Sequence, residues 1–166
     1  MKIKSIGIIL IMFVVSIPAS AQKHYQDLTY PAMRDVSIPA PKQITLDNGM
    51  KVLLLEDHEL PFISMRMQFI AGSAWEPAEK VGLADLTGIV MRTGGSISMS
   101  GDRVDEELEA IAASVETFIG TLYGGASLNT IKDHFDKVLA IYADILMNPA
   151  FPDEKIELAK IDARSG

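Results

Sequence analysis

Histidines and carboxylates are the residues of this chain that could bind a metal ion or transfer a proton. The three histidines, His24, His58 and His134, lie far apart in the sequence. One type of catalytic zinc site uses two imidazoles about one helical turn apart and a carboxylate from elsewhere, and no histidine pair here has that spacing. His58 stands between Asp57 and Glu59, so this turn could bind a cation or be ordinary surface. The chain has no cysteine, which excludes disulfides and thiolate ligands.

Residues 72–91 carry the pattern that bears most directly on function. They read G-S-A-W-E-P-A-E-K-V-G-L-A-D-L-T-G-I-V-M. This segment resembles the one in pitrilysin/insulinase-type (inverzincin) metallopeptidases where G-S-x-x-E-P-x-x-x-x-G-L-A leads into H-x-x-E-H on a zinc-binding helix. The resemblance implies that Asp85, Gly88 and Ile89 occupy the positions of the family's first His, its Glu and its second His.

Three further segments extend the resemblance over residues 42–166. L-D-N-G-M-K-V at residues 46–52 is similar to the family's opening hairpin, L-x-N-G-x-x-V. The G-G-S at residues 94–96 and the acidic helix after it resemble the segment that follows the zinc helix. D-I-L-M-N-P-A-F at residues 144–151 resembles the family's D-x-x-x-N-P-x-F. The order and spacing of these motifs identify the chain as an N-terminal domain of this family.

The departures from the family pattern fall on its catalytic positions. Asp85 could ligate a metal through oxygen, or it could be a solvated acid that the helix dipole stabilises. Gly88 has no side chain and therefore provides no general base for a metal-bound water. Ile89 cannot ligate a metal. We therefore predict a member without the zinc motif, with no catalytic residue, no metal ligand and no cofactor, although the family cofactor is zinc.

The family's third zinc ligand, a Glu late in the last helix, would fall near Gly166, where the sequence stops. Glu154 and Glu157 lie too early in that helix to replace it. We also expect the domain to be incomplete at its C-terminus, because its sheet would lack strands and leave apolar helix faces uncovered. Residues that bind substrate stay unassigned.

The elements that position these residues follow from hydrophobic periodicity and turn signals. Strand periodicity predicts a hairpin over residues 43–56, a strand over 63–69 and a strand pair over 114–121 and 122–128. Helical periodicity predicts helices over residues 80–93, 102–113, 130–147 and 152–164, with Ser100 or Asp102 capping the second. Tight hairpins and amphipathic helices predict an α+β fold, an antiparallel sheet with helices on one face. The resemblance implies the mitochondrial-processing-peptidase-like metalloenzyme fold.

The N-terminus is typical of an exported protein. Residues 1–21 have two lysines, an apolar run and A-S-A before Gln22, the pattern of a secretory signal peptide. Residues 22–41, rich in proline and tyrosine, are expected to be an extended lead-in to the domain at 42–166. Signal cleavage changes the net charge from −7 to −9 and leaves no stable membrane span. The negative net charge argues against nucleic-acid binding. From the signal-peptide pattern we expect a periplasmic or secreted protein.

Two hypotheses for function follow, from different classes. In the first, the chain is a non-catalytic subunit or half that supports a zinc-bearing peptidase of the same family acting on a peptide or unfolded protein. In the second, it is an independent exported module that binds extended peptides by strand addition. The resemblance implies the strand near residues 114–120 as the edge, because an edge strand close to the family's active site pairs with an extended peptide. An active zinc metalloendopeptidase is the third and least supported possibility. Trp75 could be an exposed recognition residue or a packing residue of its loop.

Overall fold

The computed structural model describes residues 25–165, and the chain divides into two compact units, Met1–Leu55 and Glu56–Gly166. The signal-peptide prediction for residues 1–21 lies outside the described residues, and so does His24. Within residues 25–165, no helix combines the length and the apolar character needed to cross a membrane.

The first unit contains a β-hairpin preceded by residues with little regular structure. A single 3-10 turn spans Tyr25–Asp27, and residues 28–41 form no helix or strand. Strands β1 (Lys42–Thr45) and β2 (Lys51–Leu54) then pair antiparallel. The turn between them places Gly49 at φ 85°, a backbone region that favours glycine. The hairpin predicted from the sequence is therefore confirmed.

The second unit is built on a three-stranded antiparallel sheet. Strands β3 (Phe62–Phe69), β4 (Ser114–Ile119) and β5 (Gly124–Ile131) follow the spatial order β3-β5-β4, so β5 is central. Both strands predicted after residue 113 are present. The turn between them occupies residues 120–123, so the second strand begins at Gly124 rather than at residue 122.

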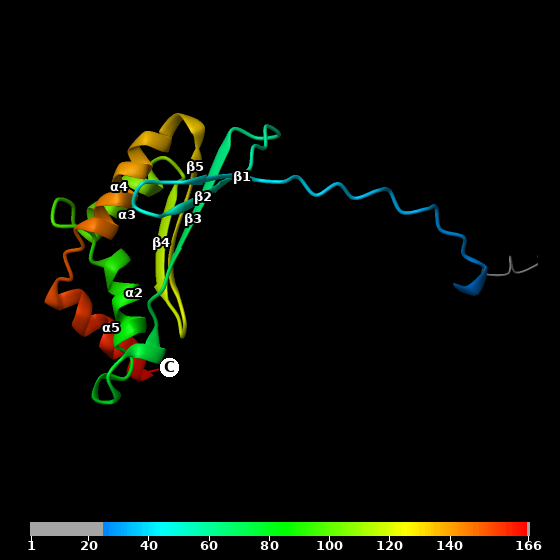
Figure 1. Ribbon diagram of the computed structural model, residues 1–166. Coiled ribbons are helices and arrows are strands. Elements are labelled where there is room, and N and C mark those ends of the chain that lie inside the picture. The colour runs from blue at the N-terminus through cyan, green and yellow to red at the C-terminus, as the bar shows by residue number, and fades with distance from the viewer. Residues whose placement is uncertain (1–24, 166) are drawn as a thin grey trace, which may run out of the picture. The chain divides into compact units, whose positions relative to one another are not determined.

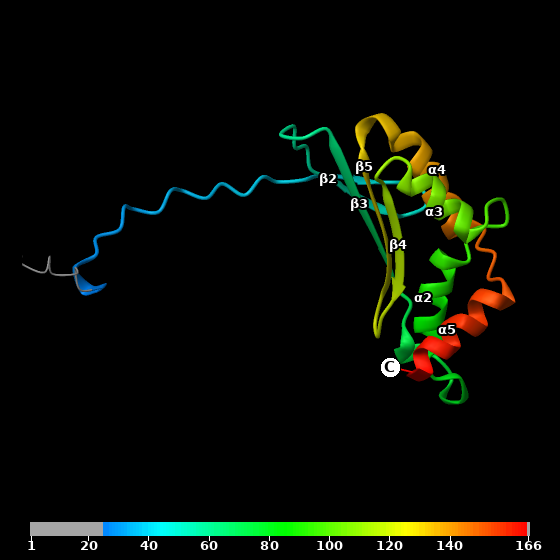
Figure 2. The ribbon, with the colours of Figure 1, turned by 180° about the vertical axis from the view of Figure 1, so that it is seen from behind.

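Helices cover one face of this sheet, which is the predicted α+β architecture. The four helices of the unit are α2 (Leu83–Thr93), α3 (Gly101–Glu109), α4 (Phe135–Met147) and α5 (Asp153–Ser165). They lie on the same side of the sheet in the front and back views (Figures 1 and 2). Within this layer α2 contacts β4 and α5, while α4 packs against β5.

The alternation of side chains along the strands separates an apolar face from a polar face. Val115, Leu128 and Ile145 are fully buried between the sheet and the helices. On the opposite face, Asn129 accepts a hydrogen bond from Ser64 Oγ at 2.5 Å and donates through Nδ2 to Ser114 Oγ at 3.2 Å. One face of the sheet thus forms the core, as the period-two pattern predicts.

Two helices begin or end at other residues than predicted. Helix α2 begins at Leu83 rather than at residue 80, because residues 78–80 form a 3-10 turn and Gly82 has φ 93°, outside helical geometry. Helix α3 follows Ser100, whose Oγ accepts the Arg103 N–H at 3.4 Å, so Ser100 rather than Asp102 is the cap. The same helix ends at Glu109 instead of residue 113.

The predicted helix over residues 130–147 is also shorter in the structure. Residues 130 and 131 still belong to β5, where Thr130 pairs with Ile63 of β3. Lys132–His134 form a 3-10 turn, and α4 starts at Phe135. Helical periodicity did not reveal this boundary because Ile131 fits both a strand and a helix pattern. Helix α5 occupies almost the predicted range.

Candidate functional site around helix α2

The loop that leads into α2 lies directly against the β4–β5 turn. The N–H groups of Ser73 and Ala74 donate to the carbonyl oxygens of Gly120 and Thr121, each at 3.0 Å. A Cβ atom at Gly72 would lie 2.2 Å from Thr121 O, so a side chain does not fit at this position. The glycine that opens the motif is therefore required for this close approach.

Glu76 fixes the N-terminus of α2. Its two carboxylate oxygens accept the N–H groups of Gly82 and Ala84 at 2.9 and 3.0 Å. These are donors that a helix start otherwise leaves without partners. The hydrogen bonds from Ala84 and Gly82 hold the pKa of the Glu76 carboxyl below its ordinary value. The acidic residue of the E-P pair thus positions the helix and is not free for proton transfer.

Gly88, which the sequence resemblance assigns to the position of the family's general base, faces β4. A Cβ atom there would lie 2.4 Å from Ile119 N and 2.9 Å from the carbonyl carbon of Phe118. The Gly88 carbonyl accepts a hydrogen bond from Thr117 Oγ1 at 2.6 Å, which ties the helix to the strand at the same point. A glutamate at residue 88 would require α2 and β4 to move apart.

Asp85 and Ile89 lie about one helical turn apart and are both exposed, Ile89 to 41%. Within residues 25–165, no three side chains of His, Cys, Asp or Glu are grouped so that they could hold a metal ion. Asp85 offers one carboxylate and Ile89 no donor atom, so these positions do not fit zinc. The chemistry of the family's motif has no counterpart in these three residues.

The remaining candidate ligands lie elsewhere. His58 is exposed and lies 3.5 Å from Glu56, which is also exposed. His134 ends the 3-10 turn before α4. In α5, Glu154 is exposed and Glu157 forms an ion pair with Lys160 at 2.7 Å. The structure does not bring these side chains together with Asp85 into a ligand set.

The outer edge of β4 is covered along much of its length. Gly120 donates its N–H to Tyr123 O, so this pair of residues is hydrogen-bonded. Because hydrogen-bonded and non-hydrogen-bonded pairs alternate along antiparallel strands, the odd-numbered residues of β4 direct their backbone groups away from β5. Arg92 Nε donates to one of these groups, the Val115 carbonyl, at 2.5 Å. Helix α2 lies against another, the N–H of Ile119. The edge that the sequence suggested for peptide addition is therefore not free.

Arg92 has a larger structural role than its position near a helix end suggested. Besides bonding to β4, its Nη2 forms an ion pair with Asp105 of α3 at 2.7 Å. One guanidinium thus joins α2, β4 and α3, which is the kind of multiple donation that arginine permits. These partners lie 23 and 13 residues from Arg92, so nothing in the local sequence indicates them.

A small hollow remains beside α2. It has a volume of about 320 Å³ and lies between the loop before α2 and the helix, with Trp75, Leu83, Thr87 and Ile119 among its lining residues. Trp75 is 59% exposed, so its ring presents apolar surface to solvent. The Glu76 carboxylate at its wall is already bonded to the helix N-terminus. The hollow can receive an apolar side chain.

Comparisons with known proteins show the family and the fold of this chain. A model of the insulinase family, peptidase family M16, matches residues 51–165. The chain is similar to a peptidase M16 inactive domain from Pseudomonas fluorescens, with a TM-score of 0.65 and 25% identity over 75% of this chain and 30% of that one. It also shares its fold with a protease from Helicobacter pylori, with a TM-score of 0.61 and 16% identity over 74% and 29% of the two chains.

The similar structures are much longer than this chain, which spans only 30% and 29% of their lengths. No curated protein matches the sequence significantly. The family is therefore assigned from the family model, which matches most of the described residues.

Proposed function

Because the chain belongs to the insulinase family, peptidase family M16, we propose that it is a non-catalytic domain that supports a zinc-bearing partner of the same family in peptide proteolysis. The observation that carries the proposal is the packing of Gly88 against Ile119. The position of the general base is filled by backbone, while the loop that positions the helix is kept. A loop and helix that lack metal ligands suit a domain that provides contact surface and no catalytic residues.

The hollow at Trp75 is the surface on which this role depends. An exposed indole beside apolar Leu83 offers a large contact area with little loss of side-chain entropy. We expect it to contact the peptide substrate or the partner. We further propose that the protein is exported and acts in the periplasm or outside the cell, from the signal-peptide pattern of residues 1–21.

Co-expression tests the proposal directly. The full chain would be produced with a zinc-bearing M16 protein from the same cell, and the hydrolysis of a quenched fluorogenic peptide would be measured for each protein alone and for the pair. We expect co-purification and a higher rate for the pair. Absence of both would refute the role. Chelator-sensitive hydrolysis by this chain alone, with one zinc per chain, would instead show an active enzyme.

A second candidate function, strand addition, finds support at β3 rather than at β4. Lys132 N–H donates to Pro61 O at 3.0 Å. Because hydrogen-bonded pairs alternate with non-hydrogen-bonded pairs along antiparallel strands, the backbone groups of the even-numbered residues point away from β5; these residues are Phe62, Ser64, Arg66 and Gln68. In the described part of the chain, no strand pairs with this edge. A pull-down with unstructured peptides, without any partner protein, tests this function. Retention of peptides by the isolated chain would favour it.

A further inference from the structure

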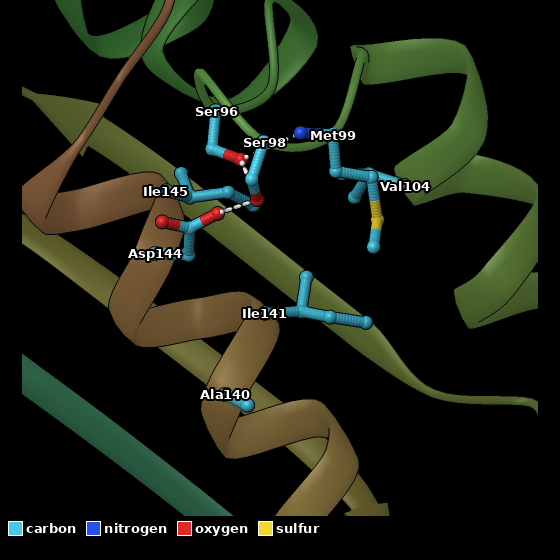
Figure 3. Close-up of a pocket in the computed structure, with 8 residues that line it drawn as sticks. All are labelled: Ser96, Ser98, Met99, Val104, Ala140, Ile141, Asp144 and Ile145. Carbon is cyan, nitrogen blue, oxygen red and sulfur yellow. Dashed lines mark hydrogen bonds between the residues drawn. The ribbon is translucent and has the colours of Figure 1, made fainter.

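A second pocket lies away from the α2 site, between α4 and the segment that joins α2 to α3. Its volume is about 270 Å³. Val104, Ile141 and Ile145 give it a buried apolar floor, and Ser96, Ser98 and Asp144 provide its polar groups (Figure 3). A pocket with this lining suits a ligand that has an apolar body and one polar end.

The charge of Asp144 has no cationic partner among the residues that the structure describes. Its carboxylate accepts hydrogen bonds from the Ser98 hydroxyl and from Asn148 Nδ2, the latter at 2.9 Å. Hydroxyl donors from Ser96 and Ser98 and the Asn148 amide lower the pKa of the Asp144 carboxyl, so it is ionised at neutral pH. Within residues 25–165, no Lys, Arg or His lies within ion-pair distance of it.

Three acids of α3 differ from Asp144 in this respect. On α3, Asp102 pairs with Lys155 at 2.7 Å, and Glu107 pairs with Lys137 at 2.6 Å. Asp105 pairs with Arg92. These charges are compensated within the chain, whereas the carboxylate at the pocket is bonded only to neutral groups. The pocket therefore carries a negative charge that a cationic group from outside the chain can neutralise.

Exposed apolar side chains occur in the same segments. Ile97, between the two serines, is 80% exposed, and Met147 at the end of α4 is 72% exposed. The Ile97 N–H donates to Asn148 O at 2.9 Å, which links the two segments. Apolar side chains next to a carboxylate favour a polypeptide partner over a free inorganic cation, since they offer area that only a larger ligand covers.

We propose that this pocket receives a lysine or arginine side chain of a partner polypeptide. The methylene stem would lie on the apolar floor at Ile141, and the cationic end would pair with Asp144. Long basic side chains commonly bury their stems in this way while their charge stays solvated or paired. The inference does not depend on the catalytic or non-catalytic nature of the chain. The competing explanation is that Asp144 only fixes the segment holding Ser98.

A titration followed by amide NMR tests the proposal on the full chain. The probes are two blocked pentapeptides that differ only in the central residue, lysine in one and norleucine in the other. We expect the lysine peptide to shift the amide signals of residues 96–99 and 140–145, and to bind roughly tenfold more tightly than the norleucine peptide. Equal affinities, or shifts confined to other residues, would overturn the proposal.

Asp144→Asn separates recognition from structure. Asparagine can still accept the Ser98 hydrogen bond through its one carbonyl oxygen and loses the acceptor for Asn148 Nδ2, an exposed group that water can bond instead. We therefore expect an unchanged fold by circular dichroism and loss of the preference for lysine. Glu116→Gln on β4 is the matched control, because it removes an exposed charge outside the pocket; the preference should persist. If Asp144→Asn does not fold, the salt dependence of binding takes the place of this variant. Adding 0.5 M NaCl should weaken the binding of the lysine peptide and leave that of the norleucine peptide unchanged. A preference that survives both changes contradicts the proposal.

Other occupants give distinct results. If n-butylammonium binds as tightly as the lysine peptide and shifts the same signals, the ligand is a free amine and the polypeptide assignment is wrong. If the chain forms dimers that Asp144→Asn dissociates, the occupant is a second copy, and the assignment to a foreign partner is wrong. Neither result bears on co-purification with a zinc-bearing M16 protein, so failure here is distinguishable from failure of the proposed function.

Discussion

The backbone of Gly88 in α2 lies against the backbone of Ile119 in β4, so close that a Cβ atom at residue 88 would approach the Ile119 nitrogen to 2.4 Å. Thr117 Oγ1 bonds to the Gly88 carbonyl beside this contact. The helix that would carry a zinc motif is therefore packed directly on the edge strand beside it. This contact leaves no room for a side chain at residue 88 and covers the edge of β4 at Ile119.

Gly88→Ala tests this packing. An alanine in a helix interior ordinarily stabilises by about 1 kcal/mol over glycine. Here the added methyl meets the backbone of a strand, and overpacking of this kind costs about 1–3 kcal/mol. The difference between the two effects is a net loss of stability of up to about 2 kcal/mol, which urea unfolding would measure. Gly120→Ala is the control, since its Cβ would lie at an ordinary 3.5 Å from Tyr123 O. A stabilised Gly88→Ala protein would contradict the model.

Restoring the family motif tests whether the frame can still hold zinc. We expect the triple variant Asp85→His, Gly88→Glu and Ile89→His to be strongly destabilised, because the glutamate has no room beside β4. The double variant without the glutamate changes only exposed positions and should keep its stability within about 0.5 kcal/mol. Elemental analysis and urea unfolding measure both. A folded triple variant with one zinc per chain would show that α2 can shift.

The sequence predicted the element order and the family because both depend on local patterns. Strict alternation over residues 63–69 and the turn at Gly49 need no knowledge of distant contacts. The exchange of catalytic residues for Asp85, Gly88 and Ile89 is equally visible in the sequence. The G-S-x-x-E-P motif has a structural explanation as well, since Gly72 allows the close approach to the β4–β5 turn and Glu76 binds the N-terminus of α2.

The sequence could not predict features that depend on long-range contacts. Arg92 bonds to Val115 and Asp105, which are 23 and 13 residues away. The closed edge of β4 follows from the distance between α2 and the strand, which no periodicity encodes. The pocket at Asp144 likewise combines segments 46 residues apart, Ser98 and Asp144. Helix boundaries were wrong where a 3-10 turn replaced the first turn of a helix.

Trp75→Ala tests the surface invoked for the supporting role. Because Trp75 is largely exposed, we expect the free energy of unfolding to change by about 1 kcal/mol or less. We expect the rate gain that the chain gives a zinc-bearing partner to fall at least roughly threefold, since exposed aromatic residues dominate contact energies. Val81→Ala, at an exposed position before α2, is the control and should leave the rate gain unchanged. If both variants change the rate gain equally, Trp75 does not contact the substrate or the partner.

The stability of the chain should depend on pH through Glu76. Hydrogen bonds from Ala84 and Gly82 lower its pKa below the ordinary value of 4.5 in the folded state. The unfolded state therefore binds the proton more readily, and the stabilisation is fully present above pH 4.5 and lost as the pH falls through the folded pKa. We expect Glu76→Gln to lower the urea midpoint at pH 7, with the difference from the unmodified chain shrinking below pH 4.5. Glu79→Gln changes an exposed acid of the same loop and is the control, which should leave the urea midpoint at pH 7 unchanged. A Glu76→Gln difference that stays constant from pH 7 to pH 3 would exclude the cap as its cause.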